Sequence, residues 1–163
     1  MNESVNGEVS MPGESVRKRV SGVTLVELLI VIVMISILAG VGFPLYSGYV
    51  MKTRRIDARI GLERIALTQE RYNAVKGSYS SDLGLLNMRG DFEINETDKS
   101  RATSESGFYT LAVTVPADNT SIFALVATPV AGKSQANDSD CTTLTLNHLG
   151  VHGGTGDDAD ECW

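Results

Sequence analysis

The sequence has little cysteine and histidine, and it carries fewer basic than acidic side chains. Only two cysteines and two histidines occur among 163 residues. A metal site is not expected, because it would require more of these ligands or better-spaced histidines. The 14 Lys and Arg residues are outnumbered by 20 Asp and Glu residues, which gives a formal charge of −6. DNA binding is therefore not expected, because neutralising phosphates requires clustered basic residues.

Signatures of catalysis are absent as well. The sequence contains no Gly-x-Ser-x-Gly element, phosphate-binding loop or zinc-peptidase signature. His148 and His152 are four residues apart, but they lie on a predicted strand and loop, so we interpret them as surface residues. We expect neither an enzyme nor a cofactor. Solvated loop carboxylates are the default interpretation of the acidic tail, and calcium is the open alternative. That tail contains Asp157, Asp158, Asp160 and Glu161.

The two cysteines, Cys141 and Cys162, both lie near the C-terminus. Such an isolated pair favours one disulfide over a metal site, and a disulfide requires an oxidising compartment. Two buried free thiols are the alternative, because cysteine packs well as a small hydrophobic residue.

One long apolar run, Val23–Phe43, stands out from the otherwise polar chain. As a helix it measures about 31 Å, which matches a bilayer core of about 30 Å. Basic residues Arg17, Lys18 and Arg19 precede it, so we expect a cytoplasmic N-terminus and export of the rest. A cleaved secretory signal is the alternative, but the run is too long and no small-residue site closes it.

Glu27 is the only charged residue between Arg19 and Lys52. A charge in mid-membrane costs about 2.5–3.5 kcal/mol on insertion scales, so such a residue is a functional candidate. Snorkelling of the side chain to the nearby interface is the structural alternative. Cleavage before Val23 would create an α-amino group, whose positive charge would offset the cost.

Residues 22–31, GVTLVELLIV, resemble the class III signal of type IV prepilins and pseudopilins. The resemblance implies that prepilin peptidase cuts after Gly22 and methylates the new N-terminus, Val23. It also implies that Glu27 aligns a subunit with the N-terminus of its neighbour. Val23 stands where the family usually has Phe. The leader is long, and Met11 is an alternative start to Met1.

A long helix is predicted over residues 23–75. Its first half, residues 23–43, is apolar all round, and its second half is amphipathic. Gly40, Gly42 and Pro44 predict a kink between the halves, because proline removes a helix hydrogen bond and glycine loosens the helix. Pilins share this plan.

The remaining residues, 76–163, are predicted to form a globular head. We expect an αβ-loop over 76–106, a small antiparallel sheet over 107–147 packed on the amphipathic half of the helix, and a loop in the tail. The fold class is therefore α+β. The expected strands are 107–115, 121–128 and 141–147.

The head resembles that of PilE-type minor pilins of the type IVa pilus. The resemblance rests on Arg71-Tyr72 with Gly77-Ser78-Tyr79, on CTTLTLN followed by Gly150, and on the final Cys162-Trp163. It implies a type IV pilin fold with a disulfide-closed D-region over 141–162.

The implied function is that of a minor pilin in pilus biogenesis, twitching motility or adhesion. Its implied partners are other pilins, prepilin peptidase and the assembly platform. The implied location is the inner membrane, crossed once with a periplasmic C-terminus, and later the extracellular pilus. A major pilin, a type II secretion pseudopilin and a membrane-anchored periplasmic binding module or enzyme are the alternatives.

Overall fold

The computed structural model describes residues 22–88 and 92–163, with the backbone alone at residues 43–45. The expected leader lies outside these residues except for its last glycine, and so do both candidate starts, Met1 and Met11. The chain divides into two compact units, which we describe separately.

The first unit, residues 1–40, contains the first half of helix α1, Leu25–Lys76. Thr24 caps this helix, because its Oγ1 accepts a hydrogen bond from the Glu27 backbone N–H at 3.2 Å. Threonine followed three residues later by glutamate is the sequence pattern of a capping box. Glu27 also lies in the first helical turn, where the helix dipole favours a negative charge.

The described side chains of residues 22–42 are all exposed. This part of α1 is strongly apolar, and a window within the helix has a mean hydropathy of 2.7. By length and composition, α1 can therefore cross a membrane. Ser36 fits such surroundings, because its hydroxyl donates to the Ile32 carbonyl at 2.8 Å within the same helix.

The second unit, residues 41–163, begins with the second half of α1. The helix is continuous through Pro44, and the kink expected around that residue stays a prediction. After Lys76, Gly77 ends the helix in a left-handed conformation with a φ of 73°. Its N–H donates to the Asn73 carbonyl at 2.7 Å, which is typical of a glycine C-cap.

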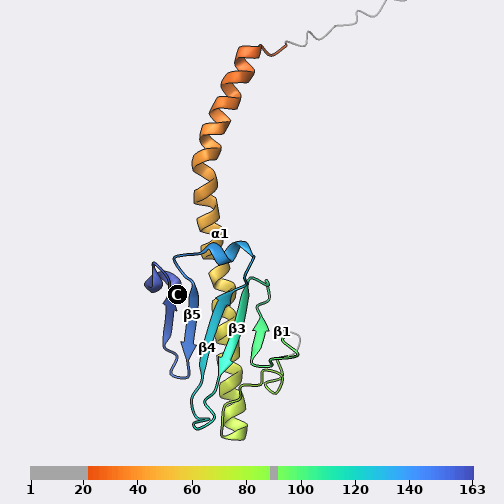
Figure 1. Cartoon of the computed structure of the whole chain (residues 1–163), viewed down its shortest axis with the longest axis vertical. Helices are drawn as coiled ribbons and strands as arrows, with labels where there is room; N and C mark the ends of the chain where they lie inside the picture. Colours follow the sequence, from red (N-terminus) through yellow and green to blue (C-terminus); the bar gives the residue numbers. More distant parts are fainter. Residues whose placement is uncertain (1–21, 89–91) are drawn as a thin grey trace, which may run out of the picture. The chain divides into compact units, whose positions relative to one another are not determined.

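A six-stranded antiparallel sheet lies against this half of α1 (Figure 1). The strands follow one another in chain order, so that each pairs with its sequence neighbour. Their bounds are β1 Glu93–Ile94, β2 Arg101–Thr103, β3 Tyr109–Thr114, β4 Ala124–Pro129, β5 Thr143–Asn147 and β6 His152–Thr155. Two short 3₁₀ turns complete the head: η1 Ser134–Asn137 and η2 Ala159–Cys162.

The α+β pilin fold predicted from the sequence is confirmed, and the three expected strands correspond to β3, β4 and β5. Two local expectations are wrong. The loop expected over 76–106 contains β1 and β2, which are too short for their alternation to be visible in the sequence. The tail expected as a loop contains β6, whose Gly153 and Gly154 give no strand signal.

The core lies between α1 and the inner face of the sheet. Alternating residues of β3, β4 and β5 are buried, among them Leu111, Leu125 and Leu144. Gly61 allows the helix and sheet to approach closely, because a Cβ there would lie 2.6 Å from the Leu111 Cδ1 atom. The buried residues that α1 contributes are Arg55, Ala58, Gly61, Leu62, Ile65 and Gln69.

Candidate functional site

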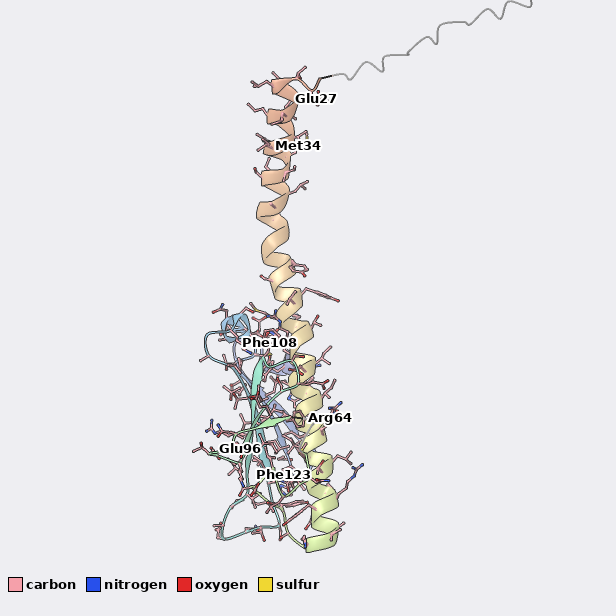
Figure 2. All side chains as sticks on the ribbon, turned by 90° about the vertical axis from the view of Figure 1, so that its right-hand side faces the viewer. Glu27, Met34, Arg64, Glu96, Phe108 and Phe123 are labelled. Carbon is pink, nitrogen blue, oxygen red and sulfur yellow. A yellow bond between two sulfur atoms is a disulfide. The ribbon has the colours of Figure 1, made fainter. Side chains whose placement is uncertain are left out.

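The predicted processing site lies at the start of α1. Gly22 and Val23 are exposed and precede the helix, so the peptide bond between them is outside regular structure. The Glu27 side chain is exposed near this end of the helix (Figure 2). Within the described part of the chain, its carboxylate has no hydrogen-bond or ion-pair partner. The arrangement thus supplies an accessible bond and a carboxylate about one helical turn beyond it.

The predicted cysteine pair is confirmed as a disulfide between Cys141 and Cys162. The segment that it closes is also tied to α1. Arg59 Nε donates to the Cys162 carbonyl at 2.9 Å, and Lys52 forms an exposed ion pair with Glu161 at 3.2 Å. The second half of α1 therefore holds the D-region through side-chain contacts as well as through the core.

The last residue, Trp163, fastens the end of the chain to the edge of the sheet. Its indole N–H donates to the Gly153 carbonyl of β6 at 2.7 Å. Its ring stacks on His152, with ring centroids 4.2 Å apart. The C-terminal turn thereby covers part of an open strand edge.

A buried ion pair lies beneath the D-region. Arg55 is 2% exposed, and its Nε and Nη2 atoms donate to the two carboxylate oxygens of Asp138 at 2.8 and 2.6 Å. Asp140 lies 3.5 Å from the same guanidinium. The hydrogen bonds from Arg55 to Asp138 raise the pKa of Arg55 despite the opposing effect of burial.

Two further polar side chains complete this network. Gln135 Nε2 donates to the Tyr109 hydroxyl at 2.8 Å and to Asp138 at 2.9 Å. Burial, followed by the nearby charge of Asp138, raises the pKa of Tyr109 to about 12. Sequence reasoning missed the network. A signal was present, because Arg55 lies three residues before the core residue Ala58 and seven before Leu62, on the buried face of α1.

A cation–aromatic cluster, defined by Arg54, Phe108 and Lys133, lies on the surface. The Arg54 guanidinium carbon is 3.9 Å from the centre of the Phe108 ring, and Lys133 Nζ is 5.6 Å from it. Arg54 also donates to Ser134 Oγ at 2.6 Å, and Lys133 to the Gly107 carbonyl. Neither cation has an ion pair with the described residues. No local sequence pattern indicates the cluster, because its three residues come from separate segments.

The alternative that the acidic tail binds calcium gains no support from the described residues. Within residues 22–88 and 92–163, no group of three or more His, Cys, Asp or Glu residues is arranged to hold a metal ion. His152 stacks on an indole, and the His148 ring lies 6.3 Å from that of Phe123. The interpretation of these histidines as ordinary surface residues stays a prediction.

Two family models match the sequence. Residues 44–145 match the family described as type IV minor pilin ComP, DNA uptake sequence receptor. Residues 17–43 match the prokaryotic N-terminal methylation motif. No curated protein matches the chain.

Proposed function

Because the chain belongs to the ComP family of type IV minor pilins, we propose that Glu27 aligns the processed subunit as it enters a pilus. The chain is a structural subunit of a type IV pilus, and its N-terminus carries the methylation motif of this class. We further propose that prepilin peptidase cuts after Gly22 and methylates Val23. The observation that carries the proposal is a single carboxylate on a helix segment whose other described side chains are uncharged and exposed.

The Glu27 carboxylate needs a nearby positive charge once it lies among apolar helices. Cleavage would free the α-amino group of Val23, four residues before Glu27. A neighbour's α-amino group near Glu27 would offset the cost of placing the charge among apolar helices. The apolar helix surface is covered by lipid before assembly and by neighbouring helices after it, so packing alone changes the free energy little. A charge pair can therefore set the axial position of a subunit.

The test compares Glu27→Ala and Glu27→Gln with Ser36→Ala, a control on the same segment. We expect all three precursors to insert in the membrane. The two Glu27 variants should be strongly depleted from sheared pili, whereas Ser36→Ala should be incorporated normally. Mass spectrometry of the mature N-terminus should show cleavage before Val23. Normal incorporation of both Glu27 variants would refute the alignment role, and a retained leader on functional subunits would refute processing.

Assembly of this kind implies a route for the subunit through the cell. The precursor would cross the inner membrane once, with its head in the periplasm, and the assembly platform would then move it into the extracellular filament. The apolar helix and the methylation motif support this route. Such a filament would serve twitching motility or adhesion.

A second function, contact with DNA, is favoured by the family description together with the cation–aromatic cluster. The negative net charge is a sum over the whole chain. It therefore does not exclude DNA binding by one positively charged face of the molecule. Arg54 and Lys133 are not neutralised by described carboxylates, and they converge on a partly exposed ring. Cations can contact phosphates, and aromatic rings can stack on bases.

The DNA proposal is tested with the full chain in detergent and short duplex DNA of varied sequence. We expect the double variant Arg54→Gln/Lys133→Gln to weaken binding severalfold and to reduce its salt dependence. The double variant Lys99→Gln/Arg101→Gln is the control, because it removes the same charge from another part of the head. Equal effects of the two variants would refute the cluster as a specific contact surface.

A further inference from the structure

Two exposed tyrosines of α1 follow the apolar run. Tyr46 and Tyr49 are 68% and 72% exposed, and they lie three and six residues after Phe43, where the run ends. Tyrosine is enriched where a membrane helix leaves the hydrocarbon core, because its ring is apolar and its hydroxyl is polar. With residues 23–43 in the hydrocarbon core, both tyrosines would therefore lie in the headgroup layer of the bilayer.

The cation–aromatic cluster lies just beyond the tyrosines. Arg54 comes five residues after Tyr49, which is about 7.5 Å along the helix axis. This distance is within one Debye length, about 8 Å at physiological ionic strength, so the charge of Arg54 acts on the headgroup layer. Phe108 lies near the end of the head where α1 enters it, and Lys133 brings a second cation to the same ring (Figure 2).

The turn η1 extends this surface without adding negative charge. Its four residues, SQAN, include no Asp or Glu. Gln135 donates to the Met51 carbonyl at 3.3 Å, so η1 lies against the same part of α1 as the cluster. Asp57 is three residues further along α1 from the apolar run than Arg54, and its Oδ2 atom is buried. The surface formed by the cluster and η1 therefore carries positive charge.

Other carboxylates of this part of the head are paired with cations. Asp138 and Asp140 both interact with the buried guanidinium of Arg55. Glu161 of the acidic tail forms an ion pair with Lys52 at 3.2 Å. These carboxylates are thus partly neutralised, whereas the two cations of the cluster have no ion pair with the described residues.

We propose that the cation–aromatic cluster binds anionic phospholipid headgroups of the membrane that α1 crosses, before the subunit enters a pilus. Basic side chains next to a membrane helix are attracted to anionic lipids, and an aromatic ring suits the interfacial layer. The inference rests on the proposed single crossing of the inner membrane. It adds that the head is held against the bilayer, and that extraction of the subunit releases the cluster for other phosphates, such as those of DNA.

The experiment uses the full chain in vesicles whose lipids carry a nitroxide on the headgroup, which quenches nearby fluorophores. The fluorophore is attached to Ala136→Cys on η1 or to Ala117→Cys in the turn between β3 and β4, and both alanines are exposed. That turn lies beside the other end of α1, because its Thr120 carbonyl accepts the Tyr79 N–H at 2.9 Å. The native cysteines are buried in their disulfide and remain unlabelled.

We expect the label on η1 to be quenched severalfold more in vesicles containing phosphatidylglycerol than in vesicles of phosphatidylcholine alone. Added salt should remove the difference, because it screens the attraction. The label in the β3–β4 turn should be quenched weakly in both. Arg54→Gln/Lys133→Gln should abolish the excess quenching. Lys99→Gln/Arg101→Gln, which removes the same charge from another part of the head, should retain it.

The outcomes separate this inference from the proposals on which it builds. Equal quenching of the η1 label with and without anionic lipid overturns the headgroup contact. If Arg54→Gln/Lys133→Gln nevertheless weakens DNA binding, the cluster contacts DNA and not the membrane. Equal losses of quenching in the two double variants overturn the cluster as the contact site. A chain that alkaline carbonate washes from the vesicles would instead refute the proposed crossing, and this inference with it.

Discussion

Arg55 carries a positive charge at 2% exposure, and Asp138 accepts hydrogen bonds from two of its nitrogens. Removing one partner of such a pair leaves the other charge buried, which costs about 3–5 kcal/mol. We expect Arg55→Met to lower the stability of the head by this order. The exposed pair of Arg64 with Glu105 is the control, and Arg64→Met should cost about 1 kcal/mol or less. Thermal unfolding of the full chain in detergent measures both, and equal losses would contradict the argument.

Tyr109 makes the stability that this network contributes depend on pH in the alkaline range. Its pKa is about 12 in the folded protein, compared with 10.0 for an ordinary tyrosine. The unfolded chain therefore releases this proton first, and stability is lost as the pH rises from about 10 to about 12. Tyr109→Phe should cost about 1 kcal/mol at neutral pH, because the bond from Gln135 is lost. Its stability should then fall less steeply above pH 10 than that of the wild type, and parallel pH profiles would contradict this.

Single residues differ in how far the sequence predicts them. Glu27 was found because a lone charge in an apolar run is unusual in itself, whatever its neighbours. The two cysteines could be paired because only two exist. Arg55 was missed because its importance depends on Asp138, 83 residues further along the chain. Its spacing from Ala58 and Leu62 places Arg55 on the buried face of α1, but no local pattern identifies its distant partner, which only the folded structure reveals.

At the scale of elements, contact between α1 and the sheet depends on a small residue in the helix. A Cβ at Gly61 would lie 2.6 Å from a side-chain atom of Leu111, whereas a Cβ at Gly48 has no neighbour within 4 Å. Alanine should stabilise an exposed helix position by about 1 kcal/mol relative to glycine. We expect Gly48→Ala to show this gain and Gly61→Ala to lie about 1–3 kcal/mol below it because of overpacking. Equal unfolding temperatures for the two variants would refute the close contact.

Long elements with many informative side chains were predicted correctly from the sequence, whereas short or glycine-rich elements were missed. The long helix and the strands β3, β4 and β5 have enough residues for their periodicity to be visible. Strand β1 has two residues and β2 has three, and they form because each finds a partner in the folded sheet: β2 pairs with β3, and β1 pairs with β2. Strand β6 is half glycine, and Gly154 is required there because a Cβ would lie 2.9 Å from that of Cys162.

At the scale of the whole molecule, the two units are adapted to different surroundings. The first consists of exposed apolar side chains on a helix that can cross a membrane, and it has no core among its described residues. The second has a buried core, an internal ion pair and a disulfide. Each unit therefore depends on different interactions, and damage to one should leave the other's function measurable.

Removal of the disulfide should impair the second unit and leave the functions of the first unit intact. Cys141 and Cys162 are 21 residues apart, and closing such a loop stabilises a protein by about 3 kcal/mol in the chain-entropy model. We expect the Cys141→Ser/Cys162→Ser variant to insert in the membrane and lose its leader normally, because those steps use the first unit. Its head should unfold at a lower temperature and be degraded faster, so that fewer subunits reach the pilus.

Glu27→Ala should show the converse pattern, with a stable head and poor incorporation. Unfolding measured in detergent, together with processing and pilus content measured in cells, distinguishes the two. If loss of the disulfide blocked insertion or processing, the units would not be independent.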